Sequence, residues 1–202
     1  MRRRPFDIIL TAGGLVLAIV LLVAGGLLMW GHDFAQSNVR SQLAEQQIVF
    51  PPKAVFDNPP AGSTEITPGM KQYLAQYGGQ QLLTGAQAKA YADHFIAVHL
   101  SEMPYGGVYS KVSAASLADP TNATLKAEVT TVFEGTTLRG LLLEAYAFGE
   151  MGQIALIASI CSFILAGVML VLSGLGFWHL RRVSPTAEIL GGPVAEPVPS
   201  LT

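Results

Sequence analysis

Two long apolar runs dominate the hydrophobic pattern of the chain. Ile8 to Trp30 and Gln153 to Trp178 contain no charged residue and are rich in Leu, Val, Ile, Ala and Gly. A helix of about 20 apolar residues crosses the ~30 Å hydrocarbon core of a bilayer, so both runs are long enough. A buried helix of a soluble protein is normally shorter or keeps a polar face. The pattern therefore predicts membrane-spanning helices at 8–30 and 153–178.

A cleaved signal peptide is the main alternative for the first run. Its apolar stretch is longer than the usual 7–15 residues, and no small-x-small cleavage sequence follows Trp30. We therefore expect an uncleaved signal anchor.

The residues between the two runs predict helices rather than strands. The first helix is expected to continue past Asp33 and to end before Pro51, because neither Gly nor Pro interrupts it. Residues 51–69, rich in Pro and Gly, predict an extended connector. Further helices are expected at about 68–76, 84–103, 108–118 and 120–134, and from Thr136 or Thr137 into the second apolar run.

Helix caps support these boundaries. Thr84 is a good N-cap, Pro104 ends the helix that Thr84 begins, and Asp119-Pro120 places proline at a first helical position. No stretch of alternating strand residues occurs. The predicted fold class is all-α, with two transmembrane helices flanking a helical extracytoplasmic domain.

Charge placement predicts the orientation in the membrane. Arginines occupy positions 2–4 before the first run and 181–182 after the second, and basic residues are retained in the cytoplasm. Residues 1–7 and 179–202 are therefore expected in the cytoplasm and 31–152 outside a bacterial cytoplasmic membrane. The tail, with four prolines and few large apolar residues, is expected to be largely disordered.

Composition narrows the possible chemistry of the central segment. Residues 31–152 carry 11 acidic and 7 basic residues, so their surface gives no electrostatic reason to bind nucleic acid. The only cysteine, Cys161, lies in the second apolar run. A disulfide, a thiol nucleophile or a cysteine metal site is therefore excluded in this segment.

The densest group of candidate ligands is "ADHFIAVHLSEMPYGG" at 92–107. His94 and His99 are five positions apart, about 140° around a helix, so they do not share one face. His99 falls within an apolar arc formed by Ala88, Tyr91, Ala92, Phe95, Ile96, Leu100 and Met103. His94 falls on the opposite side with Gln87 and Ser101, and is expected to face water.

A metal or catalytic role for this helix is the less favoured interpretation. His99 and Glu102 are three apart and can pair, but two ligands are too few for a metal site. The chain contains no H-E-x-x-H, G-x-S-x-G or P-loop sequence. We expect His99 to be a buried histidine satisfied by one hydrogen bond, and we expect no cofactor.

Small residues recur in both apolar runs. They include Gly14, Ala18 and Gly25 in the first, and Ala158, Ser162, Ala166, Gly167 and Gly174 in the second. Small residues allow helix backbones to approach closely in lipid. We expect these positions to pack the two helices together or to dock a partner protein. Neither run contains an ionisable residue, which argues against an ion pathway.

Four stretches of the chain carry a family resemblance: "SQLAEQQIVF", "GAQAKAYADHFIAVHL", "GGVYSKVS" and "TTLRGLLLEAYAFGEMGQIALI". They resemble an actinobacterial family of small two-span membrane proteins of unknown function, and the resemblance covers most of residues 8–182. Members are often labelled aromatic ring-opening dioxygenases. The residues here do not support that label, because a non-haem iron site needs two histidines and a carboxylate that converge.

Three functions remain open from the sequence. The favoured one is a non-enzymatic accessory or structural membrane protein that associates with another membrane protein or with itself. The alternative is a ligand-binding or sensory module with a pocket lined by Tyr91, Phe95, His99, Tyr105 and Tyr109. The least favoured is a metalloenzyme centred on His94, His99 and Glu102.

Overall fold

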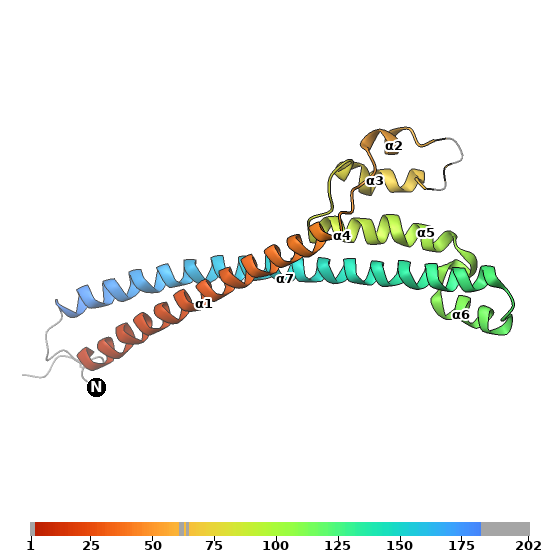
Figure 1. Ribbon diagram of the computed structural model, residues 1–202. Coiled ribbons are helices and arrows are strands. Elements are labelled where there is room, and N and C mark those ends of the chain that lie inside the picture. Colours follow the sequence, from red (N-terminus) through yellow and green to blue (C-terminus); the bar gives the residue numbers. More distant parts are fainter. Residues whose placement is uncertain (1–2, 61–62, 64, 183–202) are drawn as a thin grey trace, which may run out of the picture. The chain divides into compact units, whose positions relative to one another are not determined.

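The computed structural model describes residues 3–60, 63 and 65–182, and most of them are helical (Figure 1). Among these residues the β-structure is limited to one isolated bridge between Val49 and Gln81. The predicted all-α class is confirmed. The tail was expected to be largely disordered, and its residues from 183 onward lie outside the described part of the chain.

Two long helices contain the apolar runs. They are α1 (Arg3–Glu45) and α7 (Ala123–Leu180), and each holds a segment long and apolar enough to cross a membrane. The prediction that α1 continues beyond Trp30 is confirmed, but the helix ends at Glu45 rather than just before Pro51. Gln47 has a positive φ of 53°, and the backbone of 48–50 hydrogen-bonds to that of 80–82. This pairing takes the backbone groups that a longer helix would use.

Helix α7 is continuous where a break at Gly135 was predicted. A Cβ on Gly135 would lie 2.9 Å from Leu100 Cδ2, so this glycine permits close packing and does not end a helix. The predicted start at Asp119-Pro120 is also wrong. Asn122 caps the helix instead, because its Oδ1 accepts the Leu125 amide at 3.1 Å. Asp119 accepts hydrogen bonds from the side chains of Thr121 and Asn122.

The chain forms two compact units, and both long helices contribute to each. Unit 1 contains the described residues of Met1–Trp30 and Leu156–Thr202, and unit 2 is Gly31–Ala155. In unit 1, α1 and α7 run antiparallel (Figure 1), with Gly25 beside Ser159 and Gly14 beside Ser173.

Unit 2 adds several short helical elements to the ends of α1 and α7. They are α2 (Lys53–Asp57), η1 (Pro68–Met70), α3 (Lys71–Leu74), η2 (Ala75–Tyr77), α4 (Gly85–Tyr91), η3 (Ala92–Ile96), α5 (Ala97–Glu102), η4 (Pro104–Gly107) and α6 (Tyr109–Ala118). The helices predicted at 68–76, 84–103 and 108–118 are confirmed. The connector predicted as extended contains α2, because burial of Phe56 draws this segment onto the core.

The core of unit 2 is made of large apolar side chains. It contains Val39, Leu43, Phe50, Phe56, Ile66, Met70, Leu74, Leu82, Ala88, Ala92, Ile96 and Leu142. Burial of these side chains supplies the hydrophobic stabilisation that fixes the short helices in place.

Candidate functional site

The candidate segment begins with a capped helix. The Thr84 side chain accepts the Gln87 amide at 3.3 Å, and Gln87 Oε1 accepts the Thr84 amide at 3.1 Å, which together form a capping box. The predicted cap is therefore confirmed. Gln87 was placed on the solvent side, and that prediction is wrong, because its amide is buried among bonds to Leu83, Thr84 and Gln80.

A π-helical turn, η3, interrupts the segment where a regular helix was expected. It comprises Ala92–Ile96 and contains His94. The wider turn changes the angular position of residues on either side of it, so the helical-wheel estimate for His94 fails. His94 does not face water: it is half-buried and stacks on Tyr73, with ring centroids 3.5 Å apart and planes 3° apart.

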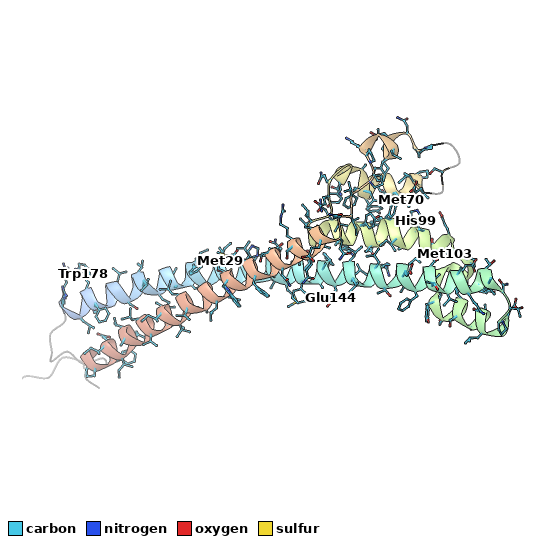
Figure 2. All side chains as sticks on the ribbon, in the orientation of Figure 1. Met29, Met70, His99, Met103, Glu144 and Trp178 are labelled. Carbon is cyan, nitrogen blue, oxygen red and sulfur yellow. The ribbon has the colours of Figure 1, made fainter. Side chains whose placement is uncertain are left out.

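His99 is a half-buried side chain held by a backbone group. Its Nδ1 lies 2.7 Å from the Phe95 carbonyl oxygen, and its ring packs on the Phe95 ring at 4.4 Å. A carbonyl only accepts hydrogen bonds, so Nδ1 is the donor. This agrees with the expected single satisfying bond. Figure 2 shows His99 on the segment that follows α4.

The three candidate metal ligands do not converge. His94 is committed to Tyr73, His99 to Phe95, and Glu102 is exposed. Within the described residues, no group of three or more His, Cys, Asp or Glu side chains is placed to hold a metal ion. The geometry gives no centre for iron chemistry at this helix.

Aromatic side chains form a continuous row inside unit 2. Ring centroids are separated by 5.3 Å for Tyr77–Phe50, 5.4 Å for Phe50–Tyr91, 4.6 Å for Tyr91–Phe95 and 4.4 Å for Phe95–His99. Burial raises the pKa of Tyr91. Offset and edge-to-face contacts of this kind stabilise a packed core.

Only three of the five proposed pocket residues belong to this row. Tyr91, Phe95 and His99 pack in succession, whereas Tyr105 and Tyr109 are exposed. Tyr109 contacts Phe133 of α7, with centroids 5.8 Å apart. The structure therefore does not bring all five side chains together around one hollow.

An ion cluster beside His94 was missed by the sequence reasoning. Asp93 Oδ2 accepts a hydrogen bond from Lys89 Nζ at 2.8 Å, and Oδ1 accepts one from Arg139 of α7 at 2.9 Å. The bond from Lys89, with help from Arg139, holds the pKa of Asp93 below its usual value. The i,i+4 spacing of Lys89 and Asp93 was a readable signal. Nothing in the sequence pointed to Arg139, 46 positions away.

Small residues do line the contact between α1 and α7 in unit 1. Ala18 and Ala166 are fully buried there, Gly25 faces the Phe163 ring, and Gly14 faces Ser173. Ala158 and Ser162 are half-buried. Gly167 and Gly174 are exposed, and a Cβ added at either would meet no atom within 4 Å.

The observed contact follows a seven-residue spacing. We call it the small-residue seam, and it consists of Thr11, Ala18 and Gly25 of α1 with Ser159, Ala166 and Ser173 of α7; all six are buried. Ser159 Oγ donates to the Gly25 carbonyl at 2.8 Å. A seven-residue repeat keeps one side of a helix against its neighbour in a left-handed pair. The predicted positions Ala158, Ser162 and Ala166, which are four residues apart, follow a different line that shares only Ala166 with the seam.

Two side chains of α1 form hydrogen bonds to backbone carbonyl groups of α7 within unit 2. His32 Nδ1 lies 2.8 Å from the Gly152 carbonyl oxygen, and Gln36 Nε2 donates to the Gly149 carbonyl at 3.0 Å. Such bonds use the second lone pair of a helical carbonyl, so they join the helices without breaking either one.

A groove of about 320 Å³ lies between α1 and α7 in unit 2. We call it the leucine groove; its lining residues are Asn38, Val39, Gln42, Leu43, Gln46, Leu138, Leu141, Leu142, Glu144, Ala145 and Phe148. One wall combines amide and apolar side chains of α1 and Gln46, and the other is made of α7 side chains that are all apolar except Glu144. Leu141 and Phe148 remain 58% and 41% exposed. This hollow, rather than the aromatic row, is where unit 2 offers concave apolar surface.

No protein family, curated protein or solved structure matches the chain. Its function must therefore be inferred from the two units themselves.

Proposed function

We propose that the protein is a two-span membrane protein whose unit 2 lies outside the cytoplasmic membrane and acts without catalysis as an accessory or structural module. The observation that carries the proposal is the composition of unit 1. Small residues fill its seam, while large apolar residues such as Ile9, Leu27 and Val171 point outward and are more than half exposed. Water would not stabilise that arrangement, whereas lipid would.

Partner binding is the role that unit 2 supports best. Its buried apolar side chains form the core, its histidines contact neighbouring groups, and its leucine groove presents exposed apolar side chains. A groove with apolar anchors and a polar rim suits a helix from a partner membrane protein or from a second copy.

Affinity capture after cross-linking in native membranes tests the proposal. The tagged full-length chain is expected to recover one dominant partner or itself, and Leu141→Ser with Phe148→Ser is expected to reduce that recovery severalfold. Leu117→Ser is the matched control, because Leu117 is also an exposed apolar residue of unit 2 and does not line the groove. A monomer that captures nothing in mild detergent would contradict an accessory role.

Labelling from outside the cell tests the placement of unit 2. On a Cys161→Ser background, Ser110→Cys in unit 2 is expected to react with a membrane-impermeant maleimide in intact cells. A cysteine at His179, beyond the second apolar run, is expected to react only after lysis. The reverse pattern would invert the proposed topology.

A small-molecule site is the second candidate, favoured by the volume of the leucine groove. About 320 Å³ is at the lower end of the range for ligand pockets. Thermal-shift screening with apolar metabolites would show stabilisation that Ala145→Phe abolishes. If no metabolite stabilises the protein and a partner is captured, only the accessory role is supported.

A further inference from the structure

A second groove lies within unit 1, between α1 and α7. Its volume is about 670 Å³, and its walls include Leu10, Gly13, Leu17, Met169, Leu172 and Gly176. We call it the hydroxyl groove, because Thr11 and Ser173 also line it. Apart from these two side chains its lining is apolar or glycine.

Both side chains line the groove, and neither hydroxyl has a hydrogen bond among the described residues. Thr11 is 7% exposed and Ser173 is 4% exposed. Thr11 Oγ1 points at Gly176 and Ser173 Oγ at Gly14, close enough that a Cβ on either glycine would lie 2.5 or 2.7 Å away. Ser159, in the same seam, bonds a backbone carbonyl. A hydroxyl on the wall of an apolar groove has no acceptor there, so a ligand that supplies one would be favoured.

The depth of these groups matches one part of a phospholipid. Thr11 lies three positions after the start of the first apolar run at Ile8, and Ser173 lies five positions before the end of the second apolar run at Trp178. At 1.5 Å per residue these depths are about 4.5 and 7.5 Å. Ester carbonyls lie at the boundary between the headgroups and the hydrocarbon core, so both hydroxyls would lie within about two helical turns of them. Leu17 and Met169 continue the groove toward the bilayer centre.

Basic residues occur in the sequences that flank the two apolar runs on the side of the chain ends. The flanking sequences contain five arginines, at 2–4 and 181–182, against one acidic residue, Asp7. The Arg182 guanidinium lies 3.9 Å above the ring of Trp178, which Figure 2 shows at the end of α7. A net positive charge at this level complements an anionic headgroup.

We propose that the hydroxyl groove binds one anionic phospholipid of the leaflet at the chain ends. Thr11 and Ser173 donate to its ester carbonyls, an acyl chain occupies the groove, and Arg181 and Arg182 attract its phosphate. This inference rests on the membrane insertion proposed above.

Native mass spectrometry of the full-length protein tests it. Protein released from bilayers of equal phosphatidylglycerol and phosphatidylcholine should retain phosphatidylglycerol preferentially. Thr11→Val with Ser173→Ala should reduce retention of both lipids severalfold. Arg181→Gln with Arg182→Gln should reduce the preference by about fivefold per arginine, the attraction of one basic residue to an anionic surface.

Filling the groove provides a second test. Gly13 has no atom within 4 Å of an added Cβ, so Gly13→Leu should occupy the groove without a clash and abolish lipid retention. Gly26→Leu is the matched control: it also adds a leucine to an exposed, open position of α1, outside the groove.

Three results would overturn the inference. The first is equal retention of the two lipids by the wild type, and the second is unchanged lipid retention in Gly13→Leu. The third is a wild-type dimer that Gly13→Leu dissociates, because that result would assign the groove to a second copy of the chain. In each case the wild type would still co-sediment with alkaline-washed vesicles. Loss of that co-sedimentation would instead reject membrane insertion itself.

Discussion

The same two helices pack in opposite ways in the two units. In unit 1 the buried residues between α1 and α7 are Gly, Ala, Ser and Thr, and most of the large apolar residues lie outside. In unit 2 the same helices bury Val39, Leu43 and Leu142, and polar residues such as Ser37 and Arg40 lie outside. One chain thus follows two packing rules along two continuous helices.

The difference is what we expect if unit 1 lies in lipid, as proposed above, and unit 2 in water. In water, large apolar side chains are driven inward because burial removes their surface from solvent. In lipid that drive is absent, and close backbone contact through small residues stabilises a helix pair. The composition of the contact therefore indicates the solvent more directly than the hydropathy of the helix does.

The largest predicted loss of stability comes from a substitution in the core of unit 2. Leu74 is 0% exposed, so Leu74→Ala should lower the free energy of unfolding of unit 2 by about 2–5 kcal/mol. Pulse proteolysis of the full-length protein in micelles across a urea series measures the change. Leu117→Ala, at a residue 78% exposed, should shift it by less than about 0.5 kcal/mol. Equal losses at both positions would refute the assigned core.

The next largest loss of stability comes from a bulky substitution in the small-residue seam of unit 1. A Cβ at Gly25 would lie 2.9 Å from the Phe163 ring, so Gly25→Leu should destabilise the helix pair by about 1–3 kcal/mol. Gly26→Leu, with open space around it, should not.

Disulfide formation reports on this pair. Antiparallel seven-residue steps from Gly25–Ser159 place Ala18 opposite Ala166, so cysteines at these two positions should cross-link on a Cys161→Ser background. Gly25→Leu should reduce the cross-linked fraction severalfold. A fraction equally reduced by Gly26→Leu would show that bulk anywhere on α1, rather than in the seam, is the cause.

A smaller effect depends on pH and belongs to unit 2. The hydrogen bond from Lys89 lowers the folded-state pKa of Asp93. Its stabilisation is therefore complete above the unfolded-state pKa near 4 and is lost as pH falls through the lower folded-state value. At neutral pH Asp93→Asn should cost about 1 kcal/mol or less, because the pair is partly solvated.

The measurement is the difference between the urea midpoints of wild type and Asp93→Asn. It should be constant near neutrality and shrink below about pH 4. Glu102→Gln, at an exposed carboxylate, should show no such convergence. A difference that persists unchanged in acid would mean that Asp93 acts through packing and not through its charge.

The smallest effect refines the packing rule of unit 1. Ser159→Ala removes the hydrogen bond to the Gly25 carbonyl and should weaken the helix pair by about 0.6 kcal/mol, a typical value in membranes. Ser162→Ala should have no measurable effect on the same cross-linking assay. A larger loss at Ser162 would favour the four-residue line over the seam.

Patterns carried by neighbouring residues were predictable from the sequence. The two apolar runs, the all-helical class and the Thr84 cap depend on spacing or on side chains a few residues apart. Tertiary pairing was not predictable in the same way. The register of α1 against α7 depends on both helices at once, so a line drawn through Ala158 and Ser162 looked as good as the real one.

The candidate site shows the same limit. His99 has the predicted hydrogen bond, from Nδ1 to the Phe95 carbonyl oxygen, but it is half-buried rather than buried. His94 was misplaced because η3 winds more widely than the helix assumed for it. Arg139 reaches Asp93 from a distant part of the chain, and only the fold brings them together.

Phe163 also restricts the register of α1 against α7 in unit 1. Small residues recur every seven positions on both helices, so a slip of one repeat would still bring small residues together. Such a slip would move either Ala18 or His32 to the place that Gly25 occupies against the Phe163 ring. A Cβ at that place would lie 2.9 Å from the ring, so Phe163 would have to move in either slipped alignment. A single aromatic side chain thus disfavours alignments that the repeat alone would allow.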